Sequence, residues 1–303
     1  MNQVLVLVGP TAVGKSDAAI EIAKQCNGEI ISGDSIQVYR GFDIGTGKVK
    51  GEEMQGIPHY LIDILNPCDR YSVADFQEMA RYKIEEIIAR GKLPILVGGT
   101  GLYIKACLYD YVFQPQNDFE LDKEIQAKDN EQLYAMLEEV DPQACLKIHI
   151  NNRKRILRAL TLALSGQSKS ETENLQQHQM LYDSFILGLT CPRDELYSRI
   201  NRRVDQMVQA GLQTEIYNLL AQGSRFSDQA MQGIGYHEWQ PYYEKRTTTE
   251  EVVEAIKLHS RQFAKRQYTW FHNQMKVNWI DIEGENWFDQ CIVQIKNWRN
   301  NNG

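Results

Sequence analysis

Val4-Leu5-Val6-Leu7-Val8-Gly9-Pro10-Thr11-Ala12-Val13-Gly14-Lys15-Ser16 is the stretch that decides the fold. Its apolar, β-branched first part, residues 4–8, predicts a fully buried strand. Residues 9–16 fit the pattern G-x-x-x-x-G-K-[ST]. Apolar residues then recur at helical spacing and predict a helix over residues 17–25, with Gly28 as its C-cap. Strand, glycine-rich loop and helix in this order predict a phosphate-binding loop, or P-loop.

The chemistry of this loop comes from its backbone. Glycines let successive N–H groups turn inward around phosphate oxygens, and the N-terminus of the following helix adds positive potential. Lys15 supplies a cation at the terminal phosphates, and the Ser16 hydroxyl is the candidate Mg²⁺ ligand. The loop alone predicts a di- or triphosphate ligand and does not distinguish the two. The candidate phosphate-binding residues are Gly9, Thr11, Ala12, Val13, Gly14, Lys15 and Ser16.

Length and composition set the broad class. The chain has 303 residues and an ordinary globular composition, which favour one large or two moderate domains. It has no apolar run long enough for a membrane span, and its N-terminus lacks the basic region of a signal peptide. Six single cysteines without a C-x-x-C pair argue against zinc or disulfides and favour reduced thiols in the cytoplasm. The net charge of −7 requires any nucleic-acid surface to be a local basic patch.

The rest of the chain alternates strands with helices. Further strands are predicted over residues 29–32, 59–64, 93–97, 184–190 and 277–282. Helices are predicted from the capping box of Ser72 and Asp75 to Gly91, over 194–221 as one helix or a pair broken at Gly211, and from Thr248 to about residue 273. This alternation predicts an α/β fold, a P-loop NTPase-like parallel sheet covered by helices.

From about Pro115 the sequence becomes polar and helix-forming, with no strand pattern over residues 118–180 and a loose hydrophilic stretch over 165–179. We therefore predict an all-helical subdomain, residues 115–183, inserted into a core formed by residues 1–114 and 184–303.

One feature of nucleotide hydrolases is missing. Those enzymes place a second carboxylate after an apolar strand to hold Mg²⁺, but the strand over residues 93–97 runs into Gly98-Gly99-Thr100. Asp34, which follows the second predicted strand, is the acid best placed beside the loop, because open α/β sheets bind ligands at the carboxyl ends of strands.

Basic residues form three clusters in this acidic chain. The first, in the insert, is Lys147, Arg153, Lys154, Arg155 and Arg158; the second is Arg199, Arg202 and Arg203; the third is Lys257, Arg261, Lys265 and Arg266. A single cluster is usually a solvated helix face. Three together favour contact with a polyanion. The histidines at 59, 149, 237 and 259 have no ligand spacing, so we expect structural roles for them.

Several motifs, in order along the chain, identify a family. They are residues 9–16 (GPTAVGKS), 34–41 (DSIQVYRG), 43–46 (DIGT), 97–103 (VGGTGLY), 234–236 (IGY) and 261–270 (RQFAKRQYTW). Together they resemble the bacterial tRNA dimethylallyltransferases, the IPP transferase family. The chain departs from the family pattern at seven positions. Ile36 stands where Met is usual, Gly47 and Gly233 where Ala is common, and Val49 and Ile150 where Pro is common. Asn152 replaces a common Asp, and His237 replaces a common Lys.

The resemblance implies a reaction. A dimethylallyl group passes from dimethylallyl diphosphate to N6 of the adenosine just 3′ of the anticodon, in tRNAs that read codons beginning with U. The P-loop would then hold a diphosphate leaving group with Mg²⁺ on Ser16, which accounts for the missing hydrolytic carboxylate. The base must leave the loop stack, and unpaired bases do so at low cost.

The resemblance also implies roles for residues. Asp34 is the candidate general base on N6, Thr100 lies on the diphosphate side of the reacting centre, and Lys15 holds the diphosphate. A further hypothesis is that Arg203 or Arg202 also neutralises the diphosphate. The residues implied to contact tRNA are Asp34, Ser35, Ile36, Gln37, Thr100, Arg153, Lys154, Arg155, Arg158, Arg261 and Lys265. The expected partners are the tRNA anticodon stem-loop and dimethylallyl diphosphate, with no membrane, and we expect a monomer.

Three other functions remain open from the sequence. An adenylate isopentenyltransferase would act on free AMP, ADP or ATP, although a small nucleotide needs neither a long insert nor three basic clusters. A P-loop nucleotide kinase would consume ATP. A non-catalytic tRNA-binding protein would bind without turnover, and Lys15, Ser16, Asp34 and Thr100 argue against it.

Overall fold

The structure, a computed structural model, describes residues 2–113, 121–166 and 179–300. Its contacts divide the chain into two compact units, one formed by Met1–Leu108 and Tyr182–Gly303 and the other by Tyr109–Leu181. The boundaries lie slightly before those predicted at 114/115 and 183/184. The predicted loose stretch over 165–179 falls mostly outside the described residues.

The first unit contains a six-stranded parallel sheet in the order β3-β2-β4-β1-β5-β6. The strands are β1 (Gln3–Val8), β2 (Gly28–Ser32), β3 (His59–Tyr60), β4 (Leu93–Gly98), β5 (Asp183–Thr190) and β6 (Asn278–Asp281). β1 lies in the interior of the sheet and is completely buried from Val4 to Val8, as its apolar sequence predicts. The predicted α/β class is therefore confirmed.

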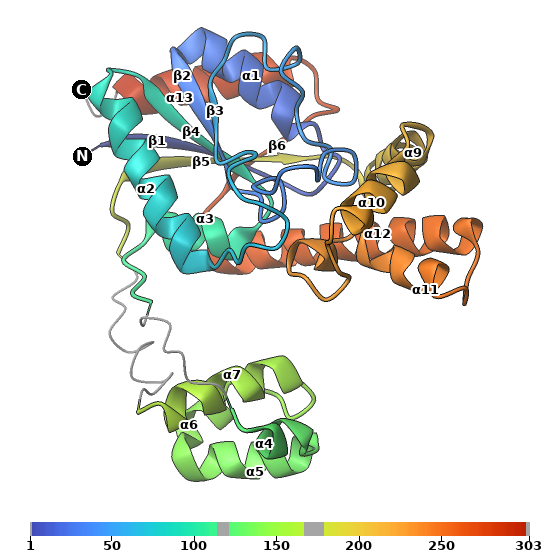
Figure 1. Cartoon of the computed structure of the whole chain (residues 1–303). Coiled ribbons are helices and arrows are strands. Elements are labelled where there is room, and N and C mark those ends of the chain that lie inside the picture. Colours follow the sequence, from blue (N-terminus) through green and yellow to red (C-terminus); the bar gives the residue numbers. More distant parts are fainter. Residues whose placement is uncertain (1, 114–120, 167–178, 301–303) are drawn as a thin grey trace. The chain divides into compact units, whose positions relative to one another are not determined.

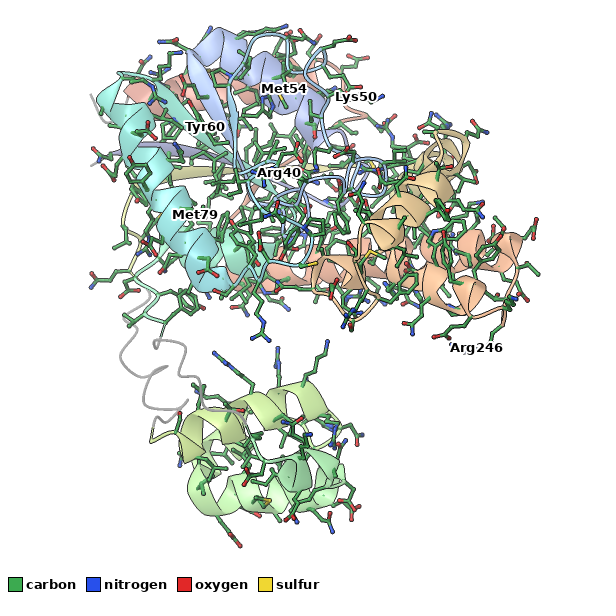
Figure 2. All side chains as sticks on the ribbon, in the orientation of Figure 1. Arg40, Lys50, Met54, Tyr60, Met79 and Arg246 are labelled. Carbon is green, nitrogen blue, oxygen red and sulfur yellow. The ribbon has the colours of Figure 1, made fainter. Side chains whose placement is uncertain are left out.

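Helices cover both faces of this sheet. In Figure 1, α1 (Lys15–Cys26) and α13 (Trp287–Asn300) lie on one face, and α2 (Val73–Ala89), α3 (Gly101–Leu108) and α12 (Thr249–Gln274) lie on the other. The helices α9 (Arg193–Gln209), α10 (Leu212–Ala221) and α11 (Gln240–Tyr243) and the 3-10 turns η1 (Ala230–Gln232) and η2 (His237–Trp239) complete the unit. Side chains fill the space between the sheet and these helices (Figure 2).

Local capping explains several helix boundaries. The predicted capping boxes at Ser72/Asp75 and Thr248/Glu251 both form and start α2 and α12. Gly211, in the left-handed region with φ of 97°, separates α9 from α10, so the predicted helix over 194–221 is a pair.

Two local predictions were wrong. Asn27, not Gly28, caps α1. Gly28 is instead the first residue of β2, where a Cβ would lie 2.6 Å from the Ile95 side chain. β3 has only two residues, although a strand to residue 64 was predicted. Leu61 and Asp63 both have positive φ, and the Asp63 carboxylate turns toward the buried ammonium of Lys48 at 2.5 Å.

The second unit is helical where it is described. It contains α4 (Lys123–Ala127), α5 (Asn130–Val140), α6 (Pro142–Cys145) and α7 (Arg153–Leu164) around its own small core, which includes Leu133, Leu137, Ile156 and Leu160. Asn152, one of the departures from the family pattern, caps α7 by accepting the Arg155 N–H, as an aspartate would. The family variation there preserves the local structure.

Candidate active site

The P-loop joins β1 to α1 with a backbone that only glycine tolerates at two points. Gly9 has φ of 149° and lies so close to β5 that a Cβ would sit 2.6 Å from the Leu189 carbonyl oxygen. Gly14, with φ of 91°, precedes α1, and no side chain caps this N-terminus. The first N–H groups of α1 are thus left for an anionic ligand.

Lys15 folds over the loop. Its ammonium donates to the carbonyl oxygens of Gly9 at 3.0 Å and Pro10 at 2.7 Å. Desolvation by burial and the positive charge of Arg203 lower the pKa of Lys15 to about 7, and the carboxylate of Asp34 opposes the shift. A diphosphate in the loop would supply the negative charge that this ammonium lacks.

Asp34 lies just beyond the carboxyl end of β2. Its Oδ1 accepts the backbone N–H groups of Ile36 at 2.8 Å and Gln37 at 3.1 Å, which fixes the side chain. The side chain of Gln37 accepts from the Ser32 hydroxyl and donates to the Thr46 carbonyl. Residues 34–37 therefore form a braced turn at the sheet edge.

Two departures from the family pattern face each other beside this turn. A Cβ at Gly233 would lie 3.2 Å from Ile36 Cγ1. The glycine thus leaves room for a β-branched side chain where the family usually has Met.

Thr100 lies where β4 meets α3, and its carbonyl accepts the N–H groups of Tyr103 and Ile104 in the first turn of that helix. The neighbouring carbonyl of Gly99 accepts from the side-chain amide of Gln267, whose oxygen in turn accepts the N–H of Thr11 at 2.9 Å. Gln267, which is only 5% exposed, therefore joins the P-loop to the β4–α3 connection from α12.

Gln267 belongs to the motif over residues 261–270, but the sequence alone predicts no role for it. The available signal was a polar residue on the buried stripe of α12, between Ala264 and Phe271.

Arg203 reaches the site from α9. Its Nη2 donates to the Thr46 carbonyl at 2.8 Å, and burial lowers its pKa while the nearby Asp34 carboxylate raises it. Arg202 lines the same cavity from an exposed position.

Two cavities meet at these residues. One, of about 660 Å³, is lined by the P-loop, by Asp34 and by Arg199, Arg202 and Arg203 of α9. The other, of about 510 Å³, has more apolar walls, among them Ile36, Ile234 and Phe263. The two share Thr11, Ala12, Asp34, Thr46, Thr100, Arg203 and Phe263. A ligand with a charged and an apolar end can therefore span both, with Asp34 and Thr100 near the junction.

A partly buried carboxylate that the sequence did not suggest holds the loop carrying Thr46. Glu215 of α10 accepts the N–H groups of Asp43, Ile44 and Gly45, and also the hydroxyl of Tyr236 at 2.7 Å. These four donors fix the segment against which Arg203 rests.

The structure separates the predicted basic residues by their contacts. Lys257 pairs with Asp205, and Arg261 donates to Asn201, so both tie α12 to α9. Arg199 pairs with Glu195 and Glu283. Lys265 is exposed. Contact of Arg261 and Lys265 with tRNA stays a prediction.

In the insert, Arg153 differs from its neighbours. Its guanidinium donates to the backbone carbonyls of Gln126 and Lys128 and to the Asn130 side chain, which joins α7 to the end of α4. Lys154, Arg155 and Arg158 are exposed, and long side chains ending in nitrogen project from α7 on the side away from α5 (Figure 2). Their contact with tRNA also stays a prediction.

The fold and this site define a P-loop α/β protein whose phosphate cradle opens into a second, more apolar cavity. The sequence profile described as IPP transferase matches residues 37–274, so the chain belongs to the IPP transferase family.

Similar proteins include a tRNA dimethylallyltransferase of Macrococcus caseolyticus, 51% identical over 97% of this chain and 96% of its own. The crystal structure of a tRNA delta(2)-isopentenylpyrophosphate transferase from Staphylococcus epidermidis has a TM-score of 0.74 and 44% identity over 98% of this chain and 99% of its own. A eukaryotic dimethylallyltransferase acting on tRNA has a TM-score of 0.82 and 30% identity over 93% of this chain and 74% of its own. In the described parts of the chain, no helix is both long and apolar enough to cross a bilayer.

Proposed function

We propose that this protein transfers a dimethylallyl group from dimethylallyl diphosphate to N6 of the adenosine 3′-adjacent to the anticodon in tRNA. The observation that carries the proposal is the junction of a cationic phosphate cavity with a more apolar cavity at Asp34 and Thr100. Near-full-length relatives named for this activity, at 46–51% identity, support it. The cytoplasm, where tRNA resides, is the expected compartment.

In the proposed reaction the bond between the allylic carbon and the diphosphate oxygen breaks, and a bond forms from that carbon to adenine N6. The bonding electron pair leaves with the diphosphate, where the P-loop amides, Lys15 and Arg203 counter the growing charge. N6 gives up one proton. Asp34 is the proposed acceptor, through Oδ2, because Oδ1 is held by two backbone amides.

The two cavities divide the substrates in this proposal. The diphosphate occupies the P-loop side. The adenine, turned out of the anticodon loop, lies against Ser35, Ile36 and Gln37 and presents N6 to Asp34. Thr100, which lines both cavities, lies at the leaving-group oxygen. Reacting atoms held in this way lose little further entropy on the way to the transition state.

Mg²⁺ is proposed as the cofactor. The Ser16 hydroxyl is exposed at the start of α1, in the wall of the cavity that also contains the Asp34 carboxylate, so hard oxygen donors of the kind Mg²⁺ prefers are present. When bound, the ion would neutralise part of the diphosphate charge. Ser16 is the residue proposed to hold it.

The test is prenyl transfer by the purified protein, with mass analysis of the product. Four acceptors are compared. They are an anticodon stem-loop RNA, which presents the target adenosine unpaired, the same RNA with guanosine at the target position, AMP and ATP. We expect modification of the first RNA alone, with one diphosphate released per transfer. Efficient prenylation of AMP would identify an adenylate isopentenyltransferase instead. Binding of RNA without turnover, or consumption of ATP without prenyl transfer, would contradict the proposal.

A further inference from the structure

The structure brings together two histidines and a glutamate outside the residues proposed to react. We propose that His237, Glu238 and His259 form a binding site for a divalent transition-metal ion, Zn²⁺ by preference. Neither histidine has a ligand spacing in the sequence, so the sequence alone predicts structural roles for both. The proposal does not depend on the function proposed above.

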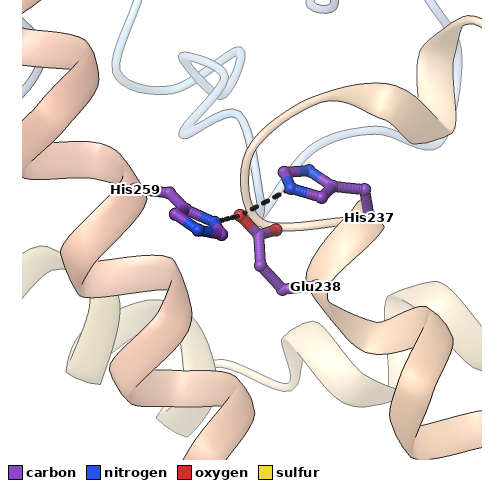
Figure 3. A group of neighbouring side chains, drawn as sticks. All are labelled: His237, Glu238 and His259. Atoms are coloured by element: carbon purple, nitrogen blue, oxygen red, sulfur yellow. Dashed lines mark hydrogen bonds and ion pairs between the residues drawn. The ribbon is translucent and has the colours of Figure 1, made fainter.

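The three side chains converge from two elements, as Figure 3 shows. His237 and Glu238 belong to η2, and His259 lies on α12. Glu238 Oε1 lies 2.8 Å from His259 Nδ1 and 3.3 Å from His237 Nε2. The two imidazole rings are nearly parallel, with an interplanar angle of 12° and centroids 5.5 Å apart. One ligand atom from each residue falls within 4.8 Å of the other two.

The hydrogen bonds outside the cluster prepare these atoms as ligands. His237 Nδ1 lies 3.1 Å from the Gly233 carbonyl oxygen, which can only accept, so Nδ1 carries a proton. In the neutral ring Nε2 then has its lone pair directed at the Glu238 carboxylate, and a cation between them removes this repulsion. A histidine that donates its other ring N–H to a backbone carbonyl is the usual arrangement around a protein-bound metal.

Glu238 is prepared in the same way. Its side chain is 1% exposed, and Oε2 accepts the N–H of Gly235 at 2.8 Å, so Oε1 remains for the two histidines. The histidine side chains are 37% and 38% exposed, which leaves an approach for the ion and a fourth, solvent ligand. Zn²⁺ with ligands at about 2.0–2.2 Å is commonly held by two histidines, one carboxylate and water.

The ion would join the 233–238 segment to α12. Gly233, Ile234, Gly235 and Tyr236 line the more apolar cavity, and α12 contributes Phe263 and Arg266 to the same walls. Metal binding would therefore stabilise that wall of the cavity. His237 stands where the family commonly has Lys, so a site of this composition is a property of this chain and not of the common family pattern.

Zinc binding by the purified, metal-stripped full chain tests the proposal. The Cys68→Ser variant serves as the parent, because Cys68 is exposed and could bind Zn²⁺ by itself. We expect one equivalent of bound Zn²⁺ and a melting temperature that rises with Zn²⁺ and falls back with EDTA. Mg²⁺ should give no such shift, because imidazole ligands suit Zn²⁺ and hard oxygen ligands suit Mg²⁺. With Co²⁺ as the probe, the absorption spectrum should lack a thiolate charge-transfer band.

Two substitutions assign the site. His237→Lys and His259→Gln should each weaken Zn²⁺ binding at least tenfold, the lower end of the loss seen around metal sites. The control is His149→Gln, at an exposed histidine of the insert, which should leave Zn²⁺ binding unchanged. Lysine at position 237 can pair with Glu238, so that variant is expected to fold. Absence of Zn²⁺ binding at micromolar concentration, or binding that neither substitution weakens, would overturn the proposal.

Discussion

The guanidinium of Arg203 rests against Gly47. Its Nη2 donates to the preceding carbonyl, that of Thr46, at 2.8 Å, and a Cβ at Gly47 would lie 2.2 Å from Nη2. The glycine, in a position where the family commonly has Ala, leaves the space that Arg203 occupies. The loop over residues 43–47, held by Glu215, thus positions a partly buried cation in the cavity that the P-loop also lines.

Arg203→Ala should lower kcat because the departing diphosphate loses a largely buried positive charge. A fall of about 10²–10³-fold is expected, the usual effect of removing one preorganised donor to a developing anion. The measurement is single-turnover prenyl transfer together with diphosphate release. Arg202→Ala, at an exposed neighbour on the same helix, is the matched control and should change kcat much less. Unchanged turnover of Arg203→Ala with weaker tRNA affinity would reassign Arg203 to backbone contact.

Asp34→Asn removes the proposed base but keeps an oxygen that can accept the N–H groups of Ile36 and Gln37. The turn should therefore persist, and the melting temperature should stay within a few degrees of the parent. The rate of the chemical step should fall about 10²–10⁴-fold, the range for general base catalysis. Affinity for dimethylallyl diphosphate, measured separately, is the control. A fully active Asp34→Asn enzyme would exclude Asp34 as the proton acceptor.

The lowered pKa of Lys15 predicts that diphosphate binding depends on pH. Its pKa of about 7 in the free protein means that the ammonium is largely lost above pH 7, whereas a bound diphosphate favours the charged form. Binding of inorganic diphosphate above pH 7 should therefore take up a proton, and affinity should fall by up to about tenfold per pH unit from this group. Calorimetry in buffers of different ionisation enthalpy measures the uptake. Lys15→Gln should abolish this component, and identical proton uptake in the variant would refute the assignment.

The same lysine contributes to stability in a defined window. Its pKa is about 7 in the folded protein against 10.5 for an ordinary lysine, so between these values the unfolded chain binds more protons than the folded one. The free energy of unfolding contributed by Lys15 therefore rises with pH from 7 to 10.5 and is level below 7. Subtracting urea-denaturation profiles of Lys15→Gln from those of the parent isolates this contribution.

The parts of the site that strand and loop patterns in the sequence reveal are made from contiguous residues. Gly9 to Ser16 and residues 34–37 lie at strand ends that hydrophobic patterning alone predicts. Gln267, Glu215 and His259 act on residues that are far away in the sequence, through contacts created only when α12 and α10 pack. For Arg153 and Arg261 the sequence predicts tRNA contact, but in the structure each guanidinium donates to neighbouring groups of the fold. Their charge alone does not reveal these contacts.

Gln267→Ala should loosen the P-loop without touching the reacting atoms. The substitution removes the hydrogen bonds to the Thr11 N–H and the Gly99 carbonyl. Both groups are then unpaired in a partly buried place, at a cost of about 1 kcal/mol, the lower end of the usual range, in the free energy of unfolding. Because Gln267 is a positioning residue, Gln267→Ala should raise KM for dimethylallyl diphosphate more than it lowers kcat. Gln267→Glu keeps the oxygen that accepts the Thr11 N–H and should therefore recover part of the loss. Equal falls in kcat for both variants, with KM unchanged, would contradict this role.

The exposed basic residues of α7 are expected to contact the phosphates of tRNA. Lys154→Ala, Arg155→Ala and Arg158→Ala should each weaken tRNA binding, and each should reduce the slope of log affinity against log salt by about 0.7–0.9 if the residue neutralises one phosphate. Arg153→Ala should behave differently because its side chain joins α7 to the end of α4. Its main effect should be a lower melting temperature of the insert, with little change in the salt slope where the protein is folded. Filter binding of an anticodon stem-loop RNA over a salt series makes the comparison, and a salt slope unchanged in all three exposed variants would remove α7 from the tRNA surface.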